Sequence, residues 1–541
     1  MAIATNSVKK NRSGGGPDTE KFRLRRFIEK LLEMGEVEVH DEPVELAQIS
    51  TIVEATPKAV LFRRAGPERL ELVANVMGSG SRLAAALGVT EAEAAAEFQR
   101  RLDRPQPVLD VSSSEAPVHQ VILMGEQADF TRLPFHPQHE YDGSVYISSA
   151  IDYTIDPESG LTNVGCRRLS LRGRSECGTN VTARSHLKMI YQRCVARGEK
   201  LPISFAVGSH PIDFMASLMR IRQDEVNLIA TLRGEPVPLV KCLTNDIRVP
   251  ADAELIIEGY LDERGYIEPE GPYGEYMGYY GPMHLDPVFH LTAMTMRRDV
   301  LHQTVLHGSG KVMGRTESAN LTAIRIEAEA FQLLKNIGIE VVGVHLPVFG
   351  GEGQHLRIAI RQTMPGQARR AIAAIFSAML SVKHVFVVDE DIDVRSDEQM
   401  DWALGTRFQA DRDMVLVQGV PGMTMDPSLE GRPIGAKAGF DLTRPFGRKP
   451  SVKHYVAGAK RFGGEARYKT VAEALTAGPH FFTHIMESVG SRDGREVALA
   501  LDELRREGRL GRDADGRYHL APAQQGRTAI VGPMEPDPNM P

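Results

Sequence analysis

The chain has 541 residues, with 64 Lys and Arg against 71 Asp and Glu, which gives a formal net charge of -7. A chain of this length exceeds what one hydrophobic core usually serves, so two or three domains are expected. The negative charge argues against a protein whose whole surface binds nucleic acid or an anionic membrane, and it favours small ligands.

The four cysteines are too few and too irregularly spaced for a disulfide framework or a Cys-rich zinc site, which favours a reducing, cytoplasmic location. They are Cys166, Cys177, Cys194 and Cys242. The first 20 residues are polar and glycine-rich, so we expect a disordered N-terminus without a secretion signal. No later stretch reaches the roughly 18 uninterrupted apolar residues of a membrane span, so no membrane insertion is expected.

Residues 21–117 predict a small α/β unit. Apolar residues recur at helical spacing from Leu24 to Leu32 and the pattern stops at Gly35, which predicts an amphipathic helix that leads into a strand. A second helix is expected to begin at Thr90. Further strands are expected at 59–66 and 71–78.

Residues 118–315 consist mainly of short apolar stretches separated by Gly, Pro and Asp turns. This pattern predicts a split β-barrel or a sandwiched sheet rather than repeated βαβ units. Helices are expected within it at about 186–198 and 212–232. Residues 317–336 then predict one long helix, which forms a linker over 316–337.

The rest of the chain predicts three further parts. Residues 338–470 alternate between strand and helix patterns, as in a second α/β domain. Residues 471–521 predict a helix followed by a tight Asp-Ala-Asp-Gly hairpin, and they resemble part of a winged-helix module. Residues 522–541 form a Pro-rich tail. The predicted fold class is therefore α+β.

The stretch 268–282, "EPEGPYGEYMGYYGP", places Glu270 and Glu275 on either side of a Gly-Pro-Tyr-Gly sequence. Two neighbouring carboxylates resist ionising together, so such a pair suits acid–base chemistry. Residues five apart on a straight strand face opposite ways, and only a bend at 271–274 brings the two carboxylates together. Two exposed glutamates in a solvated turn are the alternative.

A second polar stretch, "TNVGCRRLSL", places Asn163, Arg167 and Arg168 on an expected strand. An arginine fork binds carboxylates in a bidentate manner, although one of two adjacent arginines on a strand usually meets water. Ser185 is an expected N-cap, and His186 then opens a helix whose unpaired amides favour an anion such as phosphate. A structural role for this histidine is the alternative.

Several of these stretches, in this order, resemble the UbiD-type decarboxylases, a family named for 3-polyprenyl-4-hydroxybenzoate decarboxylase. The resemblance covers roughly residues 20–470, and "EGPYGEYMGYY" carries most of its specificity. The supporting stretches are "LRRFIEKLLEMGEVEVHDEP", "TNVGCRRLSL", "DEVNLIATLRGEPVPLVKC", "ADAELIIEG", "VFVVDEDIDV" and "WALGTR".

The resemblance implies that residues 21–315 bind prenylated flavin mononucleotide (prenylated FMN). The family's Arg-Glu-Glu catalytic network falls on Arg168, Glu270 and Glu275. The implied flavin-binding residues are Asn163, Val164, Arg167, Arg168, Ser185, His186 and Lys437. The resemblance also implies Mn²⁺ or Mg²⁺, with K⁺ as a further ion, and amide, imidazole and carboxylate donors suit either divalent metal. The implied metal ligands are Asn163, His186 and Glu225.

One departure from the family pattern concerns this metal site. Relatives often read "PVELVKC" where this chain has "PVPLVKC", so Pro238 stands in place of a glutamate. If the family's ligand is that glutamate rather than the one matched by Glu225, the implied metal site lacks a ligand.

The implied reaction is a non-oxidative, reversible decarboxylation of an aromatic, heteroaromatic or α,β-unsaturated carboxylic acid. Arg168 would hold the substrate carboxylate and keep Glu270 ionised, while Glu275 would deliver the proton. The resemblance also implies a flavin prenyltransferase that supplies the cofactor, and a homodimer or higher homo-oligomer formed through residues 338–470.

Other functions stay open at this point. The enzyme could act on a coenzyme A thioester of an aromatic acid, or run as a carboxylase, because the same residues serve both directions. A different class is a non-catalytic flavin-fold protein whose C-terminal segment contacts DNA or a partner. The charges of that segment nearly cancel, which disfavours phosphate binding, so no nucleic-acid partner is expected.

Overall fold

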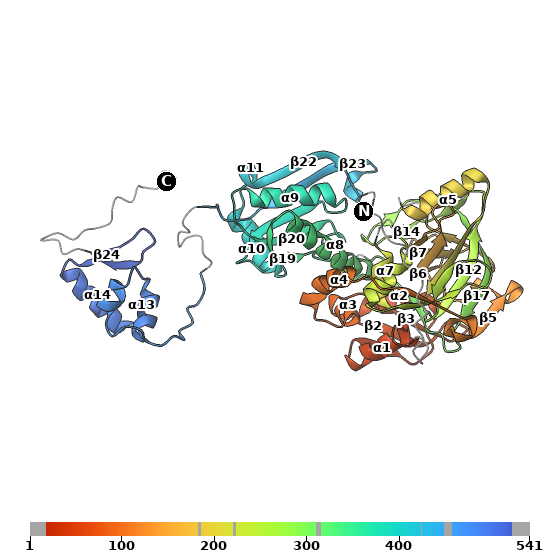
Figure 1. The fold of residues 1–541 in the computed structure, drawn as a ribbon, viewed down its shortest axis with the longest axis horizontal. Helices are drawn as coiled ribbons and strands as arrows, with labels where there is room; N and C mark the ends of the chain where they lie inside the picture. The colour runs from red at the N-terminus through yellow and green to blue at the C-terminus, as the bar shows by residue number, and fades with distance from the viewer. Residues whose placement is uncertain are drawn as a thin grey trace. The chain divides into compact units, whose positions relative to one another are not determined.

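The computed structural model describes residues 18–181, 185–219, 223–309, 315–423, 425–447 and 457–521. By its internal contacts the chain divides into two compact units, Met1–Thr443 and Arg444–Pro541, and Figure 1 shows the elements of both. Within the described ranges, no helix is long and apolar enough to cross a membrane. The Pro-rich tail and most of the expected disordered N-terminus lie outside these ranges.

The N-terminal part of the first unit is a four-stranded sheet with short helices. Its elements are α1 (Leu24–Glu33), β1 (Val37–His40), α2 (Ile49–Ala55), β2 (Ala59–Ala65), β3 (Leu70–Ala74), α3 (Gly80–Leu87), α4 (Ala94–Leu102) and β18 (His302–Thr304). The strands lie in the order β1-β2-β3-β18. The face of α1 that the sequence predicted to be apolar is buried. The carboxylate of Glu93 accepts a hydrogen bond from the backbone N–H of Thr90 at 3.1 Å, which caps the predicted second helix.

A closed β-barrel follows, and it confirms the barrel predicted from the sequence. Strands β12 (Leu255–Leu261), β9 (Leu201–Val207), β6 (Tyr146–Ile155), β7 (Thr162–Leu171), β8 (Glu176–Thr179) and β17 (Val288–Met296) pair in that order, and β17 pairs back with β12. Strand β5 (Val121–Met124) adds to β17. A separate small sheet contains β4 (Val108–Val111), β10 (Val237–Lys241) and β11 (Arg248–Pro250).

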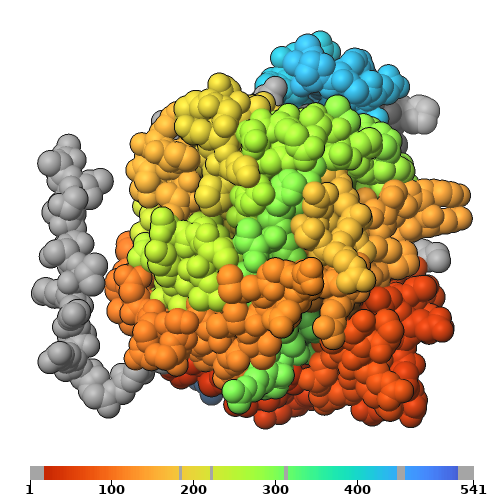
Figure 2. Space-filling model, turned by 90° about the vertical axis from the view of Figure 1, so that its right-hand side faces the viewer, coloured from red at the N-terminus to blue at the C-terminus, as the bar shows by residue number. Residues whose placement is uncertain are grey.

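The barrel and the N-terminal sheet are parts of one packed body. Buried residues of α1 and α3 share a hydrophobic cluster with residues of β9 and β12, for example Leu24, Leu83, Ala206 and Ile256. In Figure 2 the red and orange segments of the N-terminal part lie against the green segments of the barrel region on one face.

The predicted helix at 212–232 is wrong as a single helix, because the structure has two. Three helices accompany the barrel strands: α5 (His186–Arg197), α6 (Pro211–Ser217) and α7 (Val226–Arg233). The side chain of Asp224 accepts from the backbone N–H of Val226 at 3.3 Å, just before α7 begins. Such local side-chain bonds compete with helix continuation, and apolar periodicity alone does not reveal them.

A long helix and a second α/β domain complete the first unit. Helix α8 (Glu317–Asn336) has the predicted bounds, and its buried residues belong to two cores, one shared with the N-terminal part and one with the second domain. The sheet of this domain has the order β19-β20-β21-β23-β22. Its elements are β19 (Glu340–His345), β20 (His355–Arg361), α9 (Gln367–Ala378), β21 (His384–Asp389), α10 (Asp397–Arg407), α11 (Ala410–Asp413), β22 (Met414–Pro421) and β23 (Ile434–Asp441).

The second unit is small and has its own apolar core. Its elements are α12 (Val471–Thr476), α13 (Phe482–Val489), α14 (Arg495–Arg506), β24 (Leu510–Arg512) and β25 (Tyr518–Leu520). Strands β24 and β25 form the expected hairpin. A hairpin follows the helices here, and the resemblance to a winged-helix module stays a prediction.

Candidate active site

Arg168, on strand β7, lies between two buried glutamates. Its Nε and Nη2 donate to the two carboxylate oxygens of Glu270 at 2.9 and 2.8 Å, and its Nη1 donates to Oε1 of Glu275 at 2.6 Å. The three residues are 9%, 3% and 8% exposed. The guanidinium also lies 4.2 Å from the ring centre of Tyr273, a cation–π contact. The structure thus brings together the three residues predicted to form a catalytic network.

The bend between the two glutamates is fixed by local contacts. The chain here forms four very short strands: β13 (Glu268–Glu270), β14 (Tyr273–Gly274), β15 (Tyr280–Gly281) and β16 (His284–Asp286). Gly271 has a φ of +93°, a conformation that glycine adopts at little cost. The carboxylate of Asp142 accepts from the backbone N–H of Gly274 at 2.9 Å, and the Tyr273 hydroxyl donates to Gln138 Oε1 at 2.6 Å. These contacts explain how residues five apart reach one guanidinium.

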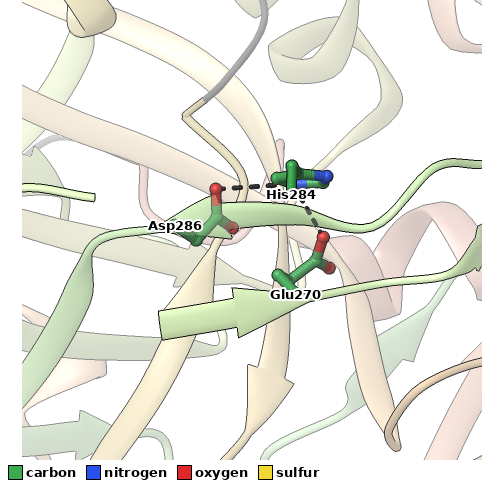
Figure 3. A group of neighbouring side chains, drawn as sticks. All are labelled: Glu270, His284 and Asp286. Atoms are coloured by element: carbon green, nitrogen blue, oxygen red, sulfur yellow. Dashed lines mark ion pairs between the residues drawn. The ribbon is translucent and has the colours of Figure 1, made fainter. Parts of the chain in front are cut away.

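Two residues that the sequence did not single out, His284 and Asp286, extend this cluster. Strand β16 pairs with β13 so that His284 lies opposite Glu270, and Figure 3 shows the imidazole between two carboxylates. Its Nε2 lies 2.9 Å from Oε2 of Glu270 and 3.5 Å from Oδ1 of Asp286. Asp286 is fully buried, and within the described residues its carboxylate has this ion pair with His284 but accepts no hydrogen bond.

The charges of this cluster shift its ionisation equilibria. Burial by itself would raise the pKa of Glu270, but the neighbouring His284 and Arg168 outweigh it and lower that pKa to about 2. Asp286 and Glu270 in turn raise the pKa of His284 to about 10. Burial raises the pKa of Asp286. Both pKa shifts favour an ionised Glu270 beside a protonated His284 at neutral pH.

Two further groups interact electrostatically with Glu275. Nε2 of His307 lies 4.0 Å from Oε2 of Glu275, and the other ring nitrogen lies 2.9 Å from the Ser318 hydroxyl. Burial lowers the pKa of His307 to about 4, so this imidazole is neutral at pH 7. Burial and the charge of Glu275 raise the pKa of Glu352, whose carboxyl accepts from the Thr316 hydroxyl. Neither group lies in a motif that the sequence marks.

The three predicted metal ligands also converge. Oε2 of Glu225 accepts from Nδ2 of Asn163 at 2.5 Å and from the backbone N–H of Val164 at 2.7 Å, and its Oε1 lies 3.3 Å from Nδ1 of His186. Oδ1 of Asn163 is buried, and no described residue donates to it. A buried amide oxygen without a partner, beside a carboxylate and an imidazole, is a donor set that fits Mn²⁺ or Mg²⁺. Glu225 is the carboxylate that lies in this group, although Pro238 departs from the family pattern.

Two other predicted cofactor residues have local roles in the fold. Ser185 is the N-cap of α5, as expected, and its hydroxyl accepts from the backbone N–H of Lys188 at 3.2 Å. Nε of Arg167 lies 3.2 Å from Oδ1 of Asp152, a fully buried carboxylate. Both residues lie on or next to elements that carry the predicted metal ligands.

Lys437, on β23, is a predicted cofactor residue whose hydrogen bond lies within the C-terminal α/β domain. Its ammonium group donates to the backbone carbonyl of Met379 at 2.7 Å, directly after the end of α9. A cation at this position neutralises the carbonyls of a helix C-terminus. The sequence showed a lysine near a glycine and did not show that it caps a helix of the C-terminal domain.

Comparisons with known proteins agree with this fold. Residues 110–310 match the 3-octaprenyl-4-hydroxybenzoate carboxy-lyase Rift-related domain. The N-terminal domain of the same carboxy-lyase matches residues 28–102, and its C-terminal domain matches 319–442.

Solved structures and a curated protein are similar over most of the chain. The UbiD-class enzyme HmfF from Pelotomaculum thermopropionicum has a TM-score of 0.76 and 32% identity, over 81% of this chain and 97% of that chain. Vanillic acid decarboxylase from Sedimentibacter hydroxybenzoicus has a TM-score of 0.74 and 26% identity, over 81% and 96%. Anhydromevalonate phosphate decarboxylase from Methanosarcina mazei is 29% identical over 441 residues, which are 80% of this chain and 98% of that protein.

The fold and these relatives define the protein as a carboxy-lyase. More particularly, the chain belongs to the UbiD family.

Proposed function

We propose that this chain catalyses the non-oxidative decarboxylation of an aromatic, heteroaromatic or α,β-unsaturated carboxylic acid with prenylated FMN. The observation that carries this proposal is the buried guanidinium of Arg168 shared between two carboxylates. The UbiD-class HmfF structures contain FMN in one case and prenylated FMN in another, which supports the cofactor. Two relatives are named as decarboxylases of different compounds, vanillic acid and anhydromevalonate phosphate, so the proposed substrate class is broad.

This reaction needs an organic cofactor. Loss of CO₂ from an unsaturated carbon leaves an electron pair in an orbital that has no resonance partner. A positioned acid or base accelerates a reaction by only about 10² to 10⁴, so side chains alone do not suffice. When bound, prenylated FMN supplies the electron sink, and the protein supplies orientation and proton delivery.

The three central residues then have distinct roles. Arg168 binds the substrate carboxylate through its fork and later releases CO₂. Glu270, held by two hydrogen bonds from Arg168, stays ionised and fixes the direction of the guanidinium. Glu275 is held by one of these nitrogens only, so its carboxyl group is freer to turn and to deliver a proton to the carbon that lost CO₂.

Asn163, His186 and Glu225 would hold Mn²⁺ or Mg²⁺, which would bind the phosphate of the flavin. Their donor types suit these ions, and the N-terminus of α5, where His186 lies, favours an anion. Asn163 and Arg168 lie on the same strand, β7, which links the proposed metal site to the proposed catalytic residues. K⁺ is proposed as a further ion.

The proposal includes two partners. A flavin prenyltransferase would supply the cofactor, and two copies of the chain would associate through the C-terminal α/β domain. An evolved dimeric form of HmfF is among the similar structures, which supports a homodimer.

The test is to co-express the chain with a flavin prenyltransferase, and to record the spectrum and mass of the bound cofactor. The purified protein is then offered a panel of aryl and vinyl carboxylic acids, including vanillic acid and anhydromevalonate phosphate, and CO₂ release is measured. We expect prenylated flavin to co-purify and at least one acid to be decarboxylated. Protein without flavin would contradict the cofactor, and loaded protein that releases CO₂ from none of the acids would contradict the reaction.

A further inference from the structure

Five ionisable side chains form a continuous row through the site. In order they are Glu275, Arg168, Glu270, His284 and Asp286, with successive contacts of 2.6, 2.8, 2.9 and 3.5 Å. Their charges alternate in sign when His284 is protonated and the three carboxyl groups are ionised. Figure 3 shows the end of this row that the sequence did not reveal.

The groups around His284 favour a proton on both of its ring nitrogens. Nδ1 lies 3.1 Å from the backbone carbonyl of Pro282, which only accepts hydrogen bonds. Nε2 lies 2.9 Å from Glu270 and 3.5 Å from Asp286, and an ionised carboxylate also only accepts. A neutral imidazole would direct one bare nitrogen at an acceptor, so the surroundings select the imidazolium.

Arg168 alone cannot balance the charges around it. One guanidinium serves two glutamates in direct contact, and a third carboxylate, Asp286, lies in the same row. In the proposed reaction the same fork must also bind the substrate carboxylate. A buried carboxylate that loses its cation takes up a proton or destabilises the fold. Glu270 therefore needs a second cation if it is to stay ionised when Arg168 turns to the substrate.

We propose that His284, oriented by Asp286, is this second cation and keeps Glu270 ionised while Arg168 binds the substrate carboxylate. The proposal rests on the function proposed above. His284 and Asp286 are positioning residues, because they act on the reaction through Glu270.

The groups around His284 support its positive charge. The titratable and charged groups that act on it or on its two carboxylate partners are Glu270, Asp286, Arg168, Tyr146 and Tyr266. Arg168 is the cation in this set, and Glu270 lies between it and the imidazole. The two ionisable groups that pair with His284 are thus both carboxyl groups.

A metal ion in place of the proton is the competing interpretation. One atom each of Glu270, His284 and Asp286 lie within 4.8 Å of one another. Both oxygens of Glu270 already accept from Arg168, however, and a metal ion there would be repelled by the guanidinium. The geometry therefore favours the imidazolium.

The first test uses the full-length protein without substrate. Exchange of the imidazole C2 hydrogens in D₂O, followed by mass spectrometry of peptides, reports the protonation of each histidine. We expect His284 to stay protonated through pH 8 and His307 to be neutral across the same range. In Asp286→Asn, His284 is expected to lose its proton at lower pH than in the wild type. A wild-type His284 that titrates near its ordinary value of about 6.5 overturns the proposal.

The second test uses the flavin-loaded enzyme and a matched control. His290 has 22% side-chain exposure against 21% for His284, and it also pairs with two carboxylates, Asp262 and Glu176. We expect His284→Gln to move the acid limb of kcat/KM upward by roughly 1–3 pH units, and His290→Gln to leave it in place. Equal profiles for the two variants overturn the proposal.

Two further outcomes separate this proposal from its alternatives. Bound metal can be counted per chain in both variants. If one metal ion is lost in Asp286→Asn but kept in Glu225→Gln, Glu270, His284 and Asp286 form a metal site, and the proposal is overturned. If no acid is decarboxylated by the wild type, the proposed function fails, while C2 exchange still decides whether His284 is the cation. The exchange test needs no variant, so it stands even if His284→Gln does not fold.

Discussion

Replacing Arg168 with methionine should loosen the bend that carries the two glutamates. Methionine fills similar space but leaves the carboxylates of Glu270 and Glu275 buried without the three hydrogen bonds that hold them. Breaking a buried ion pair by removing one partner destabilises the surrounding structure by about 3–5 kcal/mol. Glu270 keeps His284 as a partner, so we expect a value near the lower end of this range.

Native-state hydrogen exchange of peptides from residues 268–286 measures this effect locally, without assuming that the whole chain unfolds in one step. A loss of about 3–5 kcal/mol corresponds to amide exchange that is roughly 10²- to 10⁴-fold faster. Arg168→Lys keeps the charge but not the fork, so its effect should be intermediate.

Arg174→Met is the matched control for this experiment. Arg174 also pairs with a carboxylate, that of Asp129 at 3.0 Å, but its side chain is 81% exposed, and exposed pairs stabilise proteins little. If Arg168→Met changes exchange in 268–286 no more than Arg174→Met does, the buried ion pairs do not hold the site, and the reasoning above fails.

Three further predictions concern the metal site, Lys437 and acid stability. Glu225→Gln should abolish stoichiometric binding of Mn²⁺ or Mg²⁺, measured by elemental analysis. The control is Glu235→Gln, at a partly exposed ion pair with Lys21, which should keep the metal. Equal metal content in the two variants would contradict the assignment of Glu225 as a ligand. Lys437→Met should destabilise the C-terminal domain by about 0.3–2 kcal/mol in thermal unfolding, through loss of the helix cap, and an unchanged Tm would contradict this. The flavin spectrum of the same variant tests the cofactor role that the resemblance implies for Lys437. The lowered pKa of Glu270 should stabilise the fold above pH 4.5, and this contribution should be lost as pH falls toward about 2. Glu270→Gln should therefore show a flatter decline of Tm over that same pH window, and a decline identical to that of the wild type would refute the prediction.

Sequence patterns predicted those features that neighbouring residues determine, such as the ends of a helix or a bend in the chain. The apolar spacing of residues 317–336 gave the bounds of α8, and the Gly-Pro-Tyr-Gly sequence indicated the bend that unites Glu270 and Glu275. The same reasoning failed at 212–232, where a polar side chain bonds the backbone and α7 begins afresh. Periodicity reports which residues are apolar, and it does not report such competing hydrogen bonds.

Contacts that depend on tertiary pairing could not be predicted. His284 lies opposite Glu270 only because β13 and β16 pair in one particular register, which the residues between them do not specify. The resemblance implies a cofactor role for Lys437, whereas its contact with Met379 comes from the packing of β23 against α9. Asn163, His186 and Glu225 were grouped as metal ligands because of the family resemblance. They are far apart along the chain, and their spacing alone does not predict that they meet.

The central claim is that Glu275 delivers a proton to the carbon that loses CO₂. It is tested most directly by incubating the flavin-loaded enzyme with its product in D₂O and following deuterium at that carbon. We predict that Glu275→Gln keeps the cofactor spectrum and slows this exchange by about 10²-fold or more, while Glu268→Gln, two residues from Glu270 on β13, exchanges like the wild type. Exchange at the wild-type rate in Glu275→Gln would contradict the account.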